Sequence, residues 1–115
     1  LSGIWHLTQW HDVEPPFEVY MDIDASGSIT LYQRIESRYW SVYASSAEIT
    51  NDVISGVYSD DVVWGTSYEV SIDDDTMTWV AQNDATDISV YTRSELPANM
   101  PTESTRAVNS DNRFL

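Results

Sequence analysis

Hydrophobic and polar residues alternate along most of this chain, which is the pattern of a strand with one buried face and one solvent face. The clearest run is residues 17–24, in which Val19, Met21 and Ile23 fall on one face and Tyr20 falls on the other with acidic residues. A short turn follows, in which Gly27 can adopt a positive φ. Alternation then resumes over residues 29–35, so the two runs predict a hairpin.

The same pattern recurs through the first 96 residues and predicts eight short strands. These are residues 3–11, 17–24, 29–35, 39–45, 53–58, 67–72, 76–82 and 86–94. The links between them are too short for the crossover helices that parallel strands need, so the sheet should be antiparallel and sequentially paired. Closure removes both sheet edges, and eight strands enclose a space for side chains or one small ligand. We therefore expect an all-β, eight-stranded antiparallel up-and-down barrel, with a two-sheet β-sandwich as the alternative.

The composition changes from Pro97 onward. Residues 97–115 are polar, and their formal charge is near zero because Glu103 and Asp111 balance Arg106 and Arg113. We expect residues 1–96 to form the barrel and residues 97–115 to form a polar C-terminal tail. The final Phe114-Leu115 pair is apolar and could anchor the end of this tail on the barrel.

The charge of the chain limits its partners. The formal net charge is −14, with five basic residues that are all arginine. A field of this sign repels phosphate backbones and anionic membrane surfaces, so we expect no nucleic-acid partner. No apolar run is long enough for a transmembrane helix. Cysteine is absent, which excludes a disulfide framework and a thiolate metal site.

The start of the chain resembles a known family. Gly3-Ile4-Trp5 is similar to the Gly-x-Trp motif that opens the first strand of lipocalins and related calycin barrels, and Arg93 matches an arginine late in their last strand. In that family the Trp closes one end of the barrel and the Arg packs across its ring, a cation–π contact. The resemblance therefore implies that Gly3, Trp5 and Arg93 are structural. It looks closest to small lipocalin-like domains of bacterial secreted lipoproteins.

That resemblance also bears on location. The chain starts at Leu1 rather than Met, which suggests either a trimmed chain or a mature domain whose leader was removed. We therefore expect a secreted, periplasmic or cell-envelope protein, with any lipid anchor upstream of Leu1.

Aromatic residues supply the candidate site. Five Trp and seven Tyr exceed what a minimal core needs. An aromatic-lined pocket would suit an apolar or amphipathic ligand, while core filling and outer-wall packing is the competing interpretation. The expected ligand-binding residues are Trp40, Trp64, Trp79, Tyr43 and Tyr68.

Signals for catalysis or metal binding are weak. The odd spacing of His6 and His11 places them on opposite faces of one strand. No Gly-x-Ser-x-Gly elbow is present. The acidic runs Asp60-Asp61 and Asp73-Asp75 suit turns, and they lack the spacing of a dedicated calcium loop. We expect no catalytic residue, no metal and no cofactor.

Three functions follow in order of preference. The first is a non-enzymatic binding module for a small apolar or amphipathic ligand, inside or at the mouth of the barrel. The second is a protein-interaction or inhibitor domain that uses an acidic and aromatic outer surface. The third is a small hydrolase or isomerase. Aromatics gathered outside the barrel would favour the second, and titratable groups converging inside it would favour the third.

Overall fold

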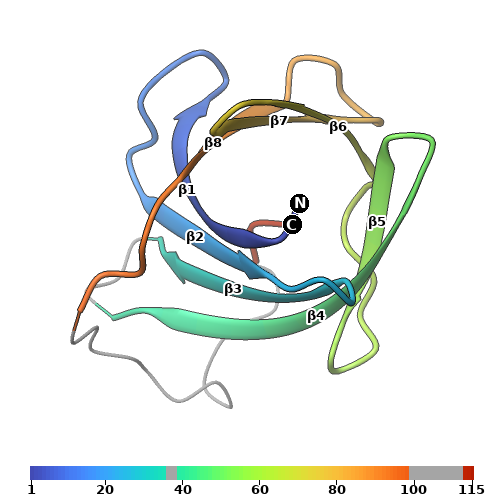
Figure 1. Cartoon of the computed structure of the whole chain (residues 1–115), viewed down its shortest axis with the longest axis horizontal. Helices are drawn as coiled ribbons and strands as arrows, with labels where there is room; N and C mark the ends of the chain where they lie inside the picture. Colours follow the sequence, from blue (N-terminus) through green and yellow to red (C-terminus); the bar gives the residue numbers. More distant parts are fainter. Residues whose placement is uncertain (36–38, 99–112) are drawn as a thin grey trace.

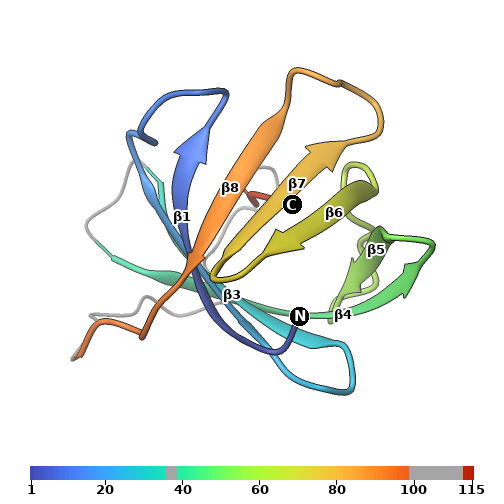
Figure 2. The same ribbon diagram turned by 45° about the horizontal axis from the view of Figure 1, so that its top comes forward.

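The computed structural model of this 115-residue chain describes residues 1–35, 39–98 and 113–115. Eight strands form a closed antiparallel barrel in which each strand pairs with its neighbours in sequence and the last pairs with the first (Figures 1 and 2). The predicted up-and-down barrel is thus confirmed, and the sandwich alternative is wrong. The strands are β1 (Gly3–Trp10), β2 (Glu18–Ile23), β3 (Ser28–Arg34), β4 (Ser41–Thr50), β5 (Val53–Tyr58), β6 (Tyr68–Asp73), β7 (Thr76–Ala81) and β8 (Ile88–Arg93).

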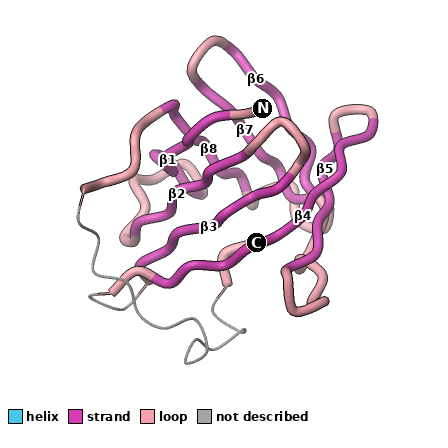
Figure 3. The backbone as a smooth tube through the Cα atoms, turned by 60° about the horizontal axis from the view of Figure 1, so that its bottom comes forward, coloured by secondary structure: helices cyan, strands magenta, loops and turns pink. Residues whose placement is uncertain are grey.

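Strands and loops make up the whole described chain (Figure 3). No helix in these ranges is long and apolar enough to cross a membrane. The strand limits agree with the prediction to within two residues except in β4, which runs five residues further than expected. It ends in the two-residue turn Asn51-Asp52, where both residues have a positive φ, as a tight hairpin requires. The hydrophobic pattern does not show the full length of this strand, because its inward positions include Ser45 and Ala47 rather than large apolar residues.

The inner face carries the core. Val19, Met21 and Ile23 of β2 are buried there as the alternation predicts. Tyr20 points outward, yet only 8 % of its surface is exposed, so the prediction that it faces solvent is wrong. Its ring stacks on His6 with centroids 4.3 Å apart, and the Trp40 ring meets it edge-on at 5.6 Å. The barrel wall is therefore covered by aromatic rings on part of its outer side.

One end of the barrel is closed where β1 begins and β8 ends. Trp5 is fully buried, and the Arg93 guanidinium lies 4.3 Å from the centre of its ring. Arg93 also donates to the Ser2 carbonyl at 3.1 Å, and the Trp5 indole donates to the Leu1 carbonyl at 2.9 Å. Gly3 has a φ of 131°, and a Cβ there would lie 2.7 Å from the Arg93 guanidinium. The arrangement links the first residues of the chain to the last strand.

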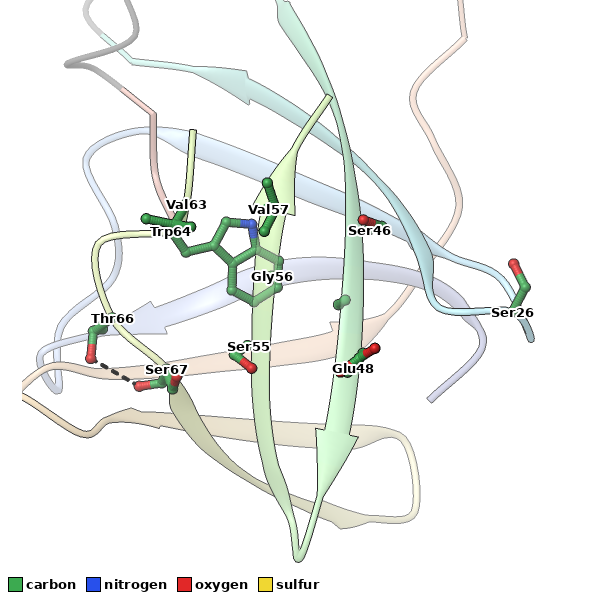
Figure 4. Close-up of a pocket in the computed structure, with 11 residues that line it drawn as sticks. Ser26, Ser46, Glu48, Ser55, Gly56, Val57, Val63, Trp64, Thr66 and Ser67 are labelled. Atoms are coloured by element: carbon green, nitrogen blue, oxygen red, sulfur yellow. Dashed lines mark hydrogen bonds between the residues drawn. The ribbon is translucent and has the colours of Figure 1, made fainter. Parts of the chain in front are cut away.

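The seam between β5 and β6 is the shortest in the barrel, with two directly paired positions. Beyond them the loop that joins these strands runs along the edge of β5 and takes the place of β6. The Tyr58 amide donates to Val62 at 2.8 Å, and the Trp64 amide donates to Gly56 at 3.1 Å. The Trp64 ring lies over Gly56 (Figure 4), and its indole N–H donates to the Ser45 hydroxyl at 2.8 Å. The loop thereby seals the wall.

Gly56→Ala should break this seal. A Cβ at this position would lie 2.4 Å from two carbons of the Trp64 ring and 2.9 Å from the Ser46 carbonyl, so the indole has to move. Overpacking of this kind costs about 1–3 kcal/mol of unfolding free energy, which urea titration would measure. Gly65→Ala is the matched control, because a Cβ there meets nothing within 4 Å. Equal losses in the two variants would contradict the account.

Candidate functional site

The C-terminal residues 113–115 lie inside the ring of strands (Figure 1). They contact Phe17, Tyr58 and Asp60, which lie at the end of the barrel opposite to Trp5, and we call this end the mouth. Leu115 is 7 % exposed and belongs to the hydrophobic core. Phe114 packs against this core and meets Phe17, just before β2, edge-on at a centroid distance of 5.7 Å. The apolar pair that the sequence places at the end of a polar tail is thus inside the mouth.

Two buried polar side chains hold the backbone of this segment. The Phe114 amide donates to Oε1 of Gln33 at 2.9 Å, and the Tyr58 hydroxyl donates to the Leu115 carbonyl at 3.1 Å. Gln33 is 3 % exposed and lies on the inward face of β3, after two aliphatic positions. A buried amide is costly unless it is hydrogen-bonded. The segment therefore meets part of the hydrogen-bonding requirement of the barrel interior.

The third anchor is Arg113. Its guanidinium carbon lies 4.7 Å from the centre of the Tyr43 ring and 4.4 Å from that of Tyr58. Both guanidinium Nη atoms donate to the Asp60 carboxylate, one of them at 3.1 Å. We call Tyr43, Tyr58 and Asp60 the cation site. Cation–π contacts strengthen when the rings are desolvated, and both tyrosines are buried.

The protonation states of Asp60 and Tyr58 favour a positively charged group in the cation site. The hydrogen bonds from Arg113 lower the pKa of Asp60 below its usual value, which keeps the carboxylate charged. Burial raises the pKa of Tyr58 well above its usual value, so the phenol stays neutral at physiological pH. Arg113 is therefore held by the Asp60 carboxylate and by two aromatic faces, one of which is the neutral phenol of Tyr58.

Two cavities flank the segment at the mouth. One has a volume of about 250 Å³ and is lined by Trp10, Phe17, Ile35, Tyr68, Asp87, Ser89, Arg113 and Phe114. The other, about 360 Å³, lies along the cation site and is lined by Val42, Tyr43, Ala44, Tyr58, Ser59, Asp60 and Arg113. Each combines aromatic surface with one carboxylate.

Four of the five predicted ligand-binding residues belong to the barrel interior. Trp79 is fully buried, and its ring centre lies 6.0 Å from that of Trp64 and 5.3 Å from that of Tyr68. Tyr43 lies 5.9 Å from Tyr58 and forms part of the cation site. Trp40 is the exception, because it packs on the outside of the barrel against Tyr20.

Sequence reasoning missed three residues that hold the segment: Gln33, Tyr58 and Asp60. Gln33 carried a readable signal, since an amide on an otherwise apolar inward row needs a partner. Tyr58 was one aromatic among many, and Asp60 was interpreted as part of an acidic turn. Their common partner is distant in the chain, since Gln33 and Phe114 are 81 positions apart.

A hollow larger than either mouth cavity lies elsewhere. It has a volume of about 690 Å³ over β4, β5 and the loop after β5 (Figure 4). Serine side chains make up much of its lining, with Glu48 as the charged member. Trp64 contributes an indole N–H that is already bonded to Ser45. This surface thus lacks the convergent aromatic and charged groups of the mouth.

Comparison with protein-family models gives no match to this sequence, and comparison with curated proteins gives no similar sequence. Within residues 1–35, 39–98 and 113–115, no group of three His, Cys, Asp or Glu side chains is placed to hold a metal ion.

Asp60→Asn should loosen the docked segment in a pH-dependent way. The lowered pKa of Asp60 means that its contribution to stability is complete above its unfolded pKa and is lost as the pH falls through the folded pKa. The variant should thus be less stable than the parent above about pH 5, and the two should converge toward about pH 2. Urea unfolding across this range measures the difference.

Asp61→Asn is the control for that experiment. It removes the same charge from the next residue, whose carboxylate forms no ion pair with Arg113. A loss in Asp61→Asn as large as in Asp60→Asn, with the same pH dependence, would show that general charge and not the Arg113 contact is responsible.

Proposed function

We propose that this chain is a non-enzymatic binding module that takes a small amphipathic ligand at the barrel mouth, in the place that residues 113–115 occupy. The proposal depends on one observation: residues 113–115 already occupy the mouth, with an apolar end in the core and a polar end at the rim. Leu115 is the apolar end, and Arg113 in the cation site is the polar end. Binding sites of this type pair apolar walls with a few placed polar groups.

The resemblance to lipocalins supports the same proposal. Trp5 and Arg93 close one end of the barrel by the contact that the resemblance implies. In a closed eight-stranded barrel the interior is wide enough for side chains or one small ligand, so the unclosed end is the natural entry. On the resemblance alone, we also propose that the module works outside the cytoplasm, secreted or at the cell envelope.

A buried indole adds a second line of support. Trp79 is fully buried, and its N–H has no hydrogen-bond partner within the described residues. Leaving a buried donor unpaired costs about 1–3 kcal/mol. A ligand that reached this indole with a hydrogen-bond acceptor would remove this cost.

The alternative functions have less support. Tyr20 and Trp40 lie on the outer wall, but both are buried, and Trp10 is half-buried. Tyr39 is the exposed Phe, Trp or Tyr residue of the described ranges, so an aromatic interaction surface has little support. The buried polar residues of the same ranges include Gln33, Ser45, Ser89 and several tyrosines. Burial raises the pKa of Tyr68 to about 12, so its phenol stays protonated at neutral pH and cannot serve there as a base. These groups suit recognition more than acid–base catalysis.

The proposal predicts that emptying the mouth increases ligand affinity. The double variant Phe114→Ser, Leu115→Ser removes the apolar contacts that hold the segment in the core. Apparent affinity falls by the fraction of molecules that are competent to bind, so opening the mouth should tighten binding of the uncharged probe N-phenyl-1-naphthylamine by about tenfold. Fluorescence titration of the full-length chain measures this affinity.

The matched control is Ile49→Ser, Val63→Ser, which makes the same kind of change at two exposed positions. It should leave probe affinity unchanged. Far-UV circular dichroism verifies that each variant keeps its sheet. Absence of saturable probe binding to the folded double variant, or equal affinity in both variants, would overturn the proposal.

A further inference from the structure

The cation site is more specific than a general amphipathic mouth requires. The Tyr43 and Tyr58 rings meet at 65°, with centroids 5.9 Å apart, and so form a corner. The guanidinium carbon of Arg113 lies within 5 Å of both ring centres, and Asp60 binds it through two hydrogen bonds. The Arg113 side chain is 11 % exposed, so the cation is almost completely enclosed.

We propose that the ligand that replaces residues 113–115 is an organic cation with an apolar tail, an alkylamine or alkylguanidine, whose head group occupies the cation site. This inference depends on the proposed function, because it names the ligand class for the same mouth.

The charge balance at the mouth selects the sign of the head group. Arg113 is the basic residue in the lining of the two mouth cavities, and Asp60 and Asp87 are the acidic residues there. When the segment leaves, the positive charge of Arg113 leaves the rim, and both carboxylates remain there. A carboxylate head group would then meet negative charge on a chain whose net charge is −14, whereas a cation restores the lost ion pair.

The rest of the segment indicates the shape of the ligand. The Gln33 side chain and the Tyr58 hydroxyl bind backbone groups between the head and the core, so they suit an amide or hydroxyl in a linker. Leu115 reaches the core and marks the position of an apolar tail. The recognised molecule therefore has a cationic head, a polar linker position and an aliphatic or aromatic end.

The test uses the full-length chain with Arg113→Gln, Phe114→Ser and Leu115→Ser, which empties both the cation site and the core position. Octylguanidinium, its uncharged isostere octylurea and octanoate serve as probes in isothermal titration calorimetry. Desolvated cation–π contacts and a charge-assisted pair should make octylguanidinium bind at least about tenfold more tightly than octylurea, with octanoate the weakest.

Two further substitutions in this background locate the bound cation. Adding Asp60→Asn or Tyr43→Leu should remove most of the preference for octylguanidinium over octylurea. Adding Asp61→Asn, which removes an equal charge one residue away, should preserve it. The Asp61→Asn arm separates binding in the cation site from general attraction to an acidic surface, which salt screens strongly.

The outcomes separate the two proposals. If octylurea or octanoate binds as tightly as octylguanidinium, the mouth binds amphipathic molecules but the cation inference is wrong. If the preference survives both Asp60→Asn and Tyr43→Leu, the cation is bound elsewhere, and the inference is likewise wrong. If none of the three probes binds, the proposed function fails together with it.

Discussion

The interior of an eight-stranded barrel has to be filled, because a void deprives the side chains around it of their packing contacts. At the closed end of this chain the filling is Trp5, covered by Arg93. At the mouth the strands supply too few apolar side chains to fill the interior. Leu115, which follows the eight strands in the sequence, completes the core there. The segment that fills this space also hydrogen-bonds to Gln33 and to Tyr58.

The sequence predicts the barrel well because its determinants are local. Alternation over β2 and β3 and the Gly27 turn between them depend on neighbouring residues alone. The end of β4 is less predictable, because Ser45 and Ala47 face inward next to Gly56 of β5, where the Trp64 ring fills the space. Apolar residues are unnecessary at positions that another segment covers.

The candidate site is only partly predictable from the sequence, because some of its contacts join residues that are far apart in the chain. Trp79 and Tyr68 lie on regular strands, so alternation places them inside. Trp40 precedes β4, where no alternation fixes its direction, and it packs outside against Tyr20. The contacts between Arg113 and Asp60 join residues 53 positions apart in the sequence. No periodic pattern encodes such a pair, so it becomes visible only when the chain is folded.

The contacts that hold residues 113–115 in the mouth differ in how strongly salt and pH affect them. Leu115 is buried, so its contribution changes little with salt or pH. Asp60 is half exposed, so its pairing with Arg113 is open to screening. Under the proposed function, a ligand would compete with an apolar contact that is nearly constant and with an ionic contact that salt and low pH weaken. Apparent affinity scales with the open fraction, so the ionic contact would set how readily residues 113–115 give way to that ligand.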